Sequence, residues 1–167
     1  MKLRLPITYR SLACSALVLA ACVGQPLDRA AVDTVLDDWH AAASRGDQTR
    51  YLDLFAPDAV FLGTDASERW TLEEFTAYVE RYFPLGGWTY QPRDRHVRFS
   101  PQGTLAWVDE LLENEKYGTL RGTSVLQRIA GEWRIAHYSM TFAVPNERSA
   151  EVVEAIRREP GAADSGQ

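Results

Sequence analysis

The stretch "YGTLRGTSVLQRIAGEWRIAHYSMTFAVPN", residues 117–146, decides the fold. Apolar and β-branched residues run on both sides of Ala130-Gly131, and small residues at such a point are typical of a tight turn between antiparallel strands. Pro145 would end the second run, because proline donates no backbone hydrogen bond to a sheet. The stretch therefore predicts a hairpin of two long strands, at about 119–130 and 132–143.

Two further extended segments precede this hairpin, at about 88–99 and 104–114. The segments "SPQG" and "NEKYG" separate them from each other and from the hairpin, and joints that contain Pro, Gly and Asn are typical of turns. Because the connections are short, we expect consecutive strands to pair side by side as an antiparallel meander.

The first half of the chain has helical spacing instead. Gly46 follows the first apolar pattern as a C-terminal cap, and Thr71 with Glu74 forms a T-x-x-E capping box ahead of the second. A short helix at about 51–55 and a strand at "AVFL" lie between them. The apolar residues at helical spacing are Val32, Val35, Leu36, Trp39 and Ala43, followed by Phe75, Tyr78, Val79, Tyr82 and Phe83.

Helices that precede a run of antiparallel strands predict an α+β fold, with three N-terminal helices packed on one face of a curved antiparallel sheet. A curved sheet wrapped over helices leaves a cone that is open at one end, and such an opening is a natural ligand pocket. The length of 167 residues suits one domain, and a hydrophobic content of 46% is enough for a packed core.

The first residues are typical of an export signal. Lys2, Arg4 and Arg10 precede the apolar run "SLACSALVLAA", which is too short to span a bilayer. The run ends in Leu-Ala-Ala-Cys22, which resembles a bacterial lipobox and predicts cleavage before a lipidated Cys22. The alternative is an ordinary signal that leaves Cys22 as a free thiol. The expected parts are a signal peptide at 1–21, a tether at 22–27, a domain at 28–145, and a short helix with a disordered tail at 146–167.

The net charge and the cysteine content of the mature chain argue against a nucleic-acid partner and an internal disulfide. Cleavage would remove three bases and no acids, which leaves 15 Lys and Arg against 23 Asp and Glu. Phosphates repel such an acidic domain, so we expect no nucleic-acid partner. Cys14 would leave with the signal, so no internal disulfide is expected. A lipid on Cys22 would hold the domain at a membrane surface that faces the periplasm or the cell exterior.

The chain resembles the SnoaL-like family of the nuclear transport factor 2-like superfamily over about residues 28–146. The resemblance is carried by "DDWHAAASRGD", "FAPDAVFLGTDASERW" and the opening stretch. It implies a cone-shaped fold and, commonly, dimers formed through the sheet. It does not imply one activity, because the superfamily includes ketosteroid isomerases, scytalone dehydratases, polyketide cyclases and members that only bind or dimerise.

The resemblance to the isomerases covers Phe55, Ala56, Asp58 and Ala59, and it implies a general-base aspartate shortly afterwards. In that register the base position falls on Gly63, which has no side chain. Asp65 lies two residues further on in "GTDASE", where an aspartate is typical of a turn that it closes on its own backbone. We therefore expect Asp65 to shape a corner of the chain.

Four residues of the predicted strands are candidates for acid–base chemistry. Asp109 and Glu110 are neighbours, so only one of them points into the cone, and apolar residues flank both. A carboxylate in apolar surroundings would have a raised pKa suited to proton transfer. The alternative for these two carboxylates is an ion pair within the sheet or a place on the solvated outer face. His137 and Tyr138 likewise point to opposite faces, and the pattern leaves open which of them points inward.

The candidates for residues that line the pocket are Arg121, Trp70 and Tyr90. For Arg121 we expect an ion pair with Glu68, buried or at the edge of the pocket, and the alternative is that it binds a ligand carboxylate. The histidines His40, His96 and His137 lie on separate elements without the spacing of metal ligands, so neither a metal nor another cofactor is expected.

Two functions follow from these patterns. The first is a lipid-anchored module that binds a small, mostly apolar molecule in the cone, or that forms a protein-interaction or homodimer surface on the sheet. The alternative is a cofactor-independent isomerase, dehydratase or cyclase that uses a pocket carboxylate and a histidine for proton transfer.

Overall fold

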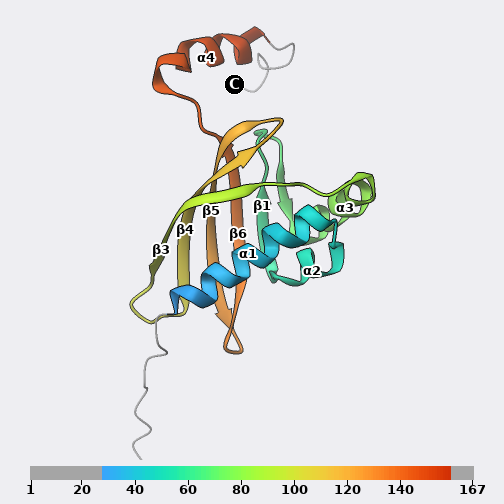
Figure 1. The fold of residues 1–167 in the computed structure, drawn as a ribbon, viewed down its shortest axis with the longest axis vertical. Coiled ribbons are helices and arrows are strands. Elements are labelled where there is room, and N and C mark those ends of the chain that lie inside the picture. Colours follow the sequence, from blue (N-terminus) through green and yellow to red (C-terminus); the bar gives the residue numbers. More distant parts are fainter. Residues whose placement is uncertain (1–27, 159–167) are drawn as a thin grey trace, which may run out of the picture.

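The computed structural model describes residues 28–158, so the predicted signal peptide, the whole tether with Cys22, and the end of the tail lie outside the described residues. Helices come first and long strands follow, as the sequence predicts (Figure 1). The elements are α1 (Arg29–Arg45), α2 (Gln48–Asp53), β1 (Phe55–Leu62), β2 (Arg69–Thr71), α3 (Leu72–Tyr82), η1 (Phe83–Leu85), β3 (Gln91–Phe99), β4 (Leu105–Asn114), β5 (Gly118–Ile129), β6 (Glu132–Phe142), η2 (Asn146–Arg148) and α4 (Ser149–Arg158).

The six strands form one curved sheet in the order β2-β1-β6-β5-β4-β3. The meander β3-β4-β5-β6 is antiparallel throughout, which confirms the predicted hairpins. The strand β1 pairs parallel with β6, however, and so joins the first half of the chain to its end. Among the described strands, the sheet is therefore antiparallel except at this one pairing, which no local sequence pattern predicts.

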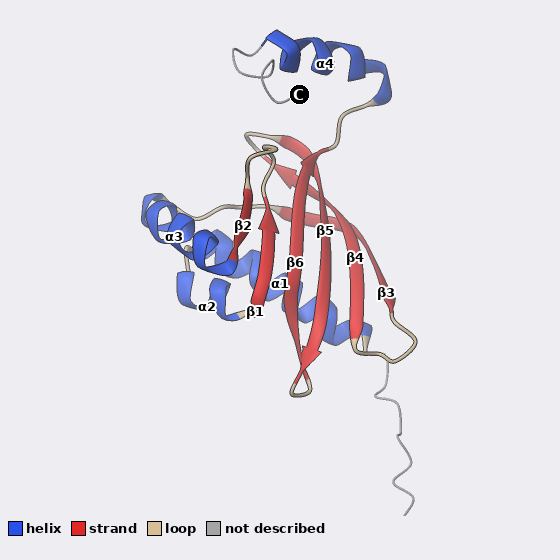
Figure 2. Cartoon of the chain, turned by 180° about the vertical axis from the view of Figure 1, so that it is seen from behind, coloured by secondary structure: helices blue, strands red, loops and turns tan. Residues whose placement is uncertain are grey.

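Helices cover a single face of the sheet. The helix α1 lies obliquely across the strands, and α2 and α3 pack beside it over β1 and β2 (Figure 1). The opposite view shows the strands of the outer face without a covering helix (Figure 2). The helix ends form as predicted, since Gly46 adopts a left-handed φ of 65° and the Thr71–Glu74 capping box is present.

A bulge at Ala136 sets which side chains of β6 point inward. Val125 of β5 pairs with His137, whereas the next residue, Leu126, pairs with Ile135. Ala136 is therefore an extra residue on β6, and the alternation of faces reverses across it. Trp133 and Ile135 are buried before the bulge, and Tyr138 and Met140 are buried after it.

The core between the layers is rich in aromatic rings. Trp39 of α1 stacks on Tyr51 of α2 with ring centroids 5.0 Å apart, and it lies 4.4 Å from the ring of Tyr138 on β6. Phe61 of β1 stacks on Phe75 of α3 at 4.0 Å. These contacts join all three helices to the centre of the sheet.

The helix α4 stands apart from this core. It lies beyond the ends of the strands in both side views (Figures 1 and 2) and none of its residues is buried. It coincides with the short C-terminal helix that the sequence predicts. No helix within residues 28–158 has the length and apolar character needed to cross a membrane.

Candidate functional site

A buried carboxylate with three partners lies between α1 and the sheet. Glu110 of β4 is 2% exposed. His40 Nε2 of α1 lies 2.8 Å from its Oε1, and the Tyr138 hydroxyl donates to the same oxygen at 3.0 Å. Arg95 Nε of β3 donates to Oε2 at 2.7 Å. Both oxygens are therefore hydrogen-bonded, as a buried charge requires.

Arg95 connects this carboxylate to the surface of α1. The side chain of Arg95 is 10% exposed, and its Nη1 donates to Asp37 Oδ1 at 2.8 Å and to the backbone carbonyl of Asp33 at 3.2 Å. The guanidinium thus lies between the buried Glu110 carboxylate and two carboxylates of α1, those of Asp37 and, at 3.5 Å, Asp33. Replacement of either Arg95 or Glu110 alone would be strongly destabilising, because it would leave the charge of the other residue buried without a partner.

A glycine makes room for the cluster. Gly122 of β5 lies opposite Glu110 in the ladder, between β4 and β6. A Cβ at this position would lie 2.2 Å from the hydroxyl oxygen of Tyr138 and 3.3 Å from Glu110 Cγ. The Tyr138–Glu110 hydrogen bond therefore depends on the absence of a side chain at residue 122.

The partners of Glu110 keep it ionised. Burial raises the pKa of Glu110, but the hydrogen bond and charge of His40, together with those of Arg95, outweigh burial and lower it. Burial beside the Glu110 carboxylate raises the pKa of Tyr138 well above its ordinary value, so its hydroxyl remains a donor. The interpretation of Glu110 as a carboxylate with a raised pKa is therefore wrong, and the alternative, an ion pair within the sheet, is confirmed by the contact with Arg95 of β3.

A cavity of about 140 Å³ lies next to this cluster, and His40 is one of the residues that line it. Nine of the fifteen lining residues are aromatic, and the exposed Thr64 and Tyr117 lie where the cavity meets solvent. The lining residues are Trp39, His40, Ala43, Tyr51, Phe61, Gly63, Thr64, Glu68, Trp70, Phe75, Tyr78, Trp88, Tyr90, Tyr117 and Met140.

His40 links the cavity to the buried carboxylate. Its Nε2 lies 2.8 Å from the ionised Glu110, so Nε2 donates its proton there whether the ring is neutral or charged, and Nδ1 is an acceptor only when the ring is neutral. Within residues 28–158 the imidazole makes no second hydrogen bond. The His40 ring is therefore held in one orientation by a charge, on the wall of a cavity.

Glu68 supplies a carboxylate where Gly63 has no side chain. A Cβ on Gly63 would lie 2.1 Å from Glu68 Oε2, so the glutamate fills the space in front of that glycine. The Asp65 backbone amide donates to the same oxygen at 3.1 Å, which fixes the side chain. No lysine or arginine of the described part of the chain forms an ion pair with Glu68. The resemblance to the isomerases places a general-base carboxylate at residue 63, and here the carboxylate next to that position belongs to Glu68.

Asp65 itself has the turn role that was expected of it. Its Oδ1 accepts hydrogen bonds from the Ser67 backbone amide at 2.8 Å and from the Ser67 hydroxyl at 2.5 Å. These bonds lower the pKa of the exposed Asp65 carboxyl. An Asx turn of this kind shapes the connection between β1 and β2.

The structure separates the predicted candidates by sheet face. Glu110 and Tyr138 point inward and bond to each other, whereas Asp109 and His137 point to the outer face. Arg121 is also exposed on the outer face, so its expected place in the pocket and its expected ion pair with Glu68 are both wrong. The strand register is the reason, because Arg121 neighbours the inward Gly122. Trp70 and Tyr90 line the cavity.

Three residues of the site were missed in the sequence. The sequence patterns do not point to His40 and Arg95 as partners of Glu110, and they place Glu68 only beside Arg121. His40 carried a local signal, because it lies four residues after Leu36 on the buried stripe of α1. Arg95 follows Asp94, whose left-handed φ of 50° marks the irregular pairing of β3, and no sequence pattern predicts that geometry.

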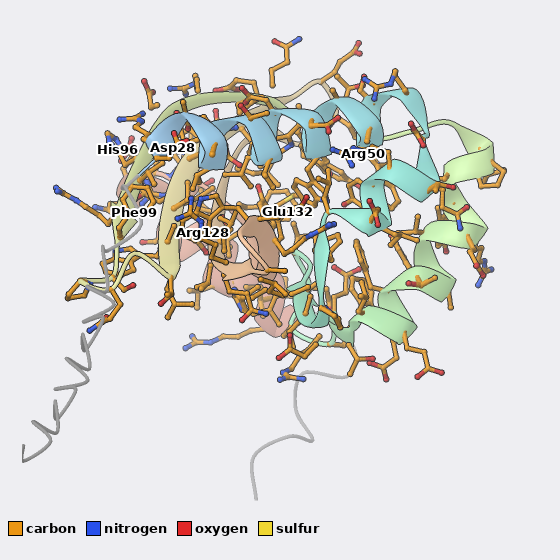
Figure 3. All side chains as sticks on the ribbon, turned by 90° about the horizontal axis from the view of Figure 1, so that it is seen from below. Asp28, Arg50, His96, Phe99, Arg128 and Glu132 are labelled. Atoms are coloured by element: carbon orange, nitrogen blue, oxygen red, sulfur yellow. The ribbon has the colours of Figure 1, made fainter. Side chains whose placement is uncertain are left out.

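The three histidines remain far from forming a metal site. His40 is buried under α1, His137 faces outward, and His96 lies exposed at the margin of the molecule when it is viewed from below (Figure 3). In the described residues, no three His, Cys, Asp or Glu side chains are grouped so that they would hold a metal ion.

The comparison with solved structures places this geometry in a known fold. A cystatin-like domain of unknown function from Nostoc punctiforme is 17% identical with a TM-score of 0.66, over 83% of this chain and 91% of that one. A protein from Parabacteroides distasonis, provisionally described as a ketosteroid isomerase, is 14% identical with a TM-score of 0.56, over 68% of this chain and 86% of that one. A protein from Streptomyces avermitilis, provisionally described as a dehydratase of the NTF2-like family, is 13% identical with a TM-score of 0.60, over 70% of this chain and 96% of that one.

These identities are too low to show more than the fold, and no curated protein matches the chain. The sequence itself matches the SnoaL-like domain family over residues 32–145, which spans α1 to the end of β6 and includes every residue of the buried cluster and of the cavity. The chain therefore belongs to the SnoaL-like domain family and has the NTF2-like (nuclear transport factor 2-like) α+β fold.

Proposed function

We propose that the protein binds a small, mostly apolar molecule in the cavity under α1. The observation that carries this proposal is the aromatic lining of a cavity of about 140 Å³. An apolar cavity of roughly this volume, about 150 Å³, accepts a ligand such as benzene. The expected ligand is therefore about the size of one six-membered ring, and its polar group would meet His40 or Glu68.

Filling the cavity tests this proposal. Ala43 of α1 lines the cavity and is 3% exposed, so Ala43→Leu would add atoms to the space that the ligand needs. We expect the wild type to bind monocyclic aromatic compounds in calorimetry or tryptophan fluorescence, and Ala43→Leu to bind them at least tenfold more weakly. Arg121→Ala on the outer face is the matched control and should bind as the wild type does. Equal binding by Ala43→Leu would contradict the proposal.

Proton transfer without a cofactor is the second candidate function, and the Glu110–His40 pair is the observation that favours it. An imidazole whose Nε2–H is held by an ionised carboxylate presents Nδ1 as a base. Glu68 lines the same cavity and is a second acid–base group, in front of the position where the resemblance to isomerases implies one. One group would take a proton from a carbon of the ligand, and the other would return a proton to it.

Exchange of ligand hydrogen atoms with solvent separates the two candidates. Incubation in D₂O with small cyclic ketones should introduce deuterium next to the carbonyl if His40 or Glu68 removes that proton, and NMR detects the change. His40→Gln and Glu68→Gln should each lower the exchange rate by a factor of about 100, within the usual contribution of general acid–base groups. Binding without exchange would leave the ligand-binding function and remove the enzymatic one.

We further propose that this domain works at a membrane surface. The proposal rests on the lipobox-like end of the signal, where Leu19, Ala20 and Ala21 precede Cys22. Acyl chains on Cys22 would hold the domain without a membrane-spanning helix. Ligand binding would then take place outside the cytoplasm.

A further inference from the structure

The charge of the cavity wall narrows the class of ligand. Glu68 is an acidic group among the lining residues, and none of those residues is a lysine or an arginine. An anionic ligand would meet the Glu68 carboxylate and find no cation to offset it. A carboxylate in an otherwise aromatic wall favours a positive charge instead.

Glu68 is not neutralised by a neighbour. Its Oε2 accepts one hydrogen bond, from the uncharged backbone amide of Asp65 at 3.1 Å. In the part of the chain that the structure describes, no basic side chain forms an ion pair with it. Burial raises the pKa of Tyr78 above its ordinary value, and the Glu68 charge adds to this effect. Burial also raises the pKa of Tyr90 to about 12, and there the neighbouring Tyr117 and Tyr78 contribute more than Glu68 does.

Several of the nine aromatic side chains that line the cavity, which together we call the aromatic belt, contact one another. Trp70 and Tyr78 stack with centroids 4.8 Å apart, Tyr78 lies 5.7 Å from Trp88, and Phe61 stacks on Trp70 at 6.1 Å. The faces of such rings carry negative electrostatic potential and attract cations, especially those without tightly bound water. At the rim, the exposed Lys116 ammonium lies 4.7 Å from the ring centroid of Tyr117 and also donates a hydrogen bond to the Tyr117 hydroxyl at 3.1 Å.

We infer that the cavity takes a small organic cation, of the class of methylated ammonium compounds, held by the aromatic belt and paired with Glu68. A methylated ammonium group suits a site of this kind because it combines an apolar surface with a full positive charge. The inference rests on the proposed binding function and specifies its ligand.

A pair of isosteres tests the charge separately from the shape. Choline and 3,3-dimethylbutan-1-ol have nearly the same volume, but only choline is charged. We expect choline to bind the wild-type domain at least tenfold more tightly at pH 8, measured by calorimetry and by fluorescence of the lining tryptophans. Glu68→Gln should remove most of this difference, because the amide keeps the bond from Asp65 and loses the charge. Glu73→Gln, which removes an exposed carboxylate from α3, should leave the difference unchanged.

Two results would overturn the inference. One is equal or tighter binding of the neutral alcohol by the wild type, and the other is a choline preference that Glu68→Gln leaves intact. If neutral rings such as toluene or indole bind and choline does not, the inference is wrong while the proposed binding function stands. If neither the cations nor the neutral rings bind, the proposed function itself is wrong.

Discussion

His40 and Glu110 are 70 residues apart in the chain, and His40 Nε2 lies 2.8 Å from Glu110 Oε1 in the interior of the domain. The contact joins the middle of α1 to the middle of β4, and both side chains are almost completely buried. Because Arg95 and Tyr138 bond to the same carboxylate, the four residues act as one polar unit inside an aromatic core.

Removal of the Glu110 charge should destabilise the fold strongly. The amide of Glu110→Gln would present an NH₂ group to donors that now face an oxygen, and Arg95 would lose its buried counter-ion. We expect the free energy of unfolding to fall by about 3 kcal/mol, as for other buried pairs that lose one partner. Urea denaturation measures the change. Asp109→Asn on the outer face of the same strand should change it by no more than about 0.5 kcal/mol, and similar losses in both variants would contradict a special role for Glu110.

The contribution of Glu110 should also depend on pH. Its pKa is lower in the folded protein than the ordinary value of 4.5, so the ionised group stabilises the fold above that value. As the pH decreases below the pKa of Glu110 in the unfolded chain, the unfolded state takes up a proton first. The stabilisation by Glu110 then decreases by at most about 1.4 kcal/mol for each pH unit. We therefore expect the stability difference between wild type and Glu110→Gln to be constant from pH 6 to 7 and to shrink from about pH 4.5 towards pH 3. A difference that grows on acidification would show the opposite shift in pKa.

The general fold was predictable because its signals are local. Alternation, turn residues and the Thr71–Glu74 capping box act within a few residues of chain, and each is present as expected. Helix and strand patterns of this kind need no knowledge of distant contacts. The parallel pairing of β1 with β6 joins segments that are distant in the chain, so no local sequence pattern predicted it.

The face of each candidate on β6 was not predictable for a different reason. Both alternating sets of "WRIAHYSMTF" are apolar enough to be buried, and the bulge at Ala136 exchanges them halfway along the strand. A regular strand with Trp133 and Ile135 inward would have placed His137 inward as well. The bulge turns His137 outward and places Tyr138 against Glu110. One extra residue thus decides which side chain belongs to the site.

Gly122 should be intolerant of even one carbon atom. A methyl group there would overlap the Tyr138 hydroxyl, which lies 2.2 Å from the Cβ position. We expect Gly122→Ala to lower the free energy of unfolding by about 2 kcal/mol, in the usual range for overpacking. In a double-mutant cycle, addition of Tyr138→Phe should cost less in the alanine background than in the wild type, because the overlapping hydroxyl is removed. Strict additivity of the two changes would contradict this account.

Lipidation at Cys22 is testable in cells. If Cys22 carries acyl chains, the full-length protein should be labelled by palmitate and should sediment with membranes. Cys22→Ser should abolish the labelling and move the protein to the soluble fraction, because the chain would lose its anchor. Cys14→Ser, inside the predicted signal, is the control and should remain labelled. Labelling of neither the wild type nor the control would instead support an ordinary cleaved signal.

The outer face of the sheet is the surface that we propose for a homodimer. Trp107 of β4 is 49% exposed there, and its ladder neighbours are Arg98 of β3 and Val125 of β5. An exposed tryptophan on the outer face of the sheet, which none of the described helices covers, is typical of an interface anchor (Figure 2). A second copy is the expected occupant, since apolar and oppositely charged side chains, including Asp109 and Arg121, lie on the same face. Trp107→Glu should therefore convert a dimer into a folded monomer in light scattering, whereas Leu85→Glu, at an exposed residue of η1, should not. A wild-type domain that is monomeric at 100 µM, or a Trp107→Glu variant that stays dimeric, would rule this interface out.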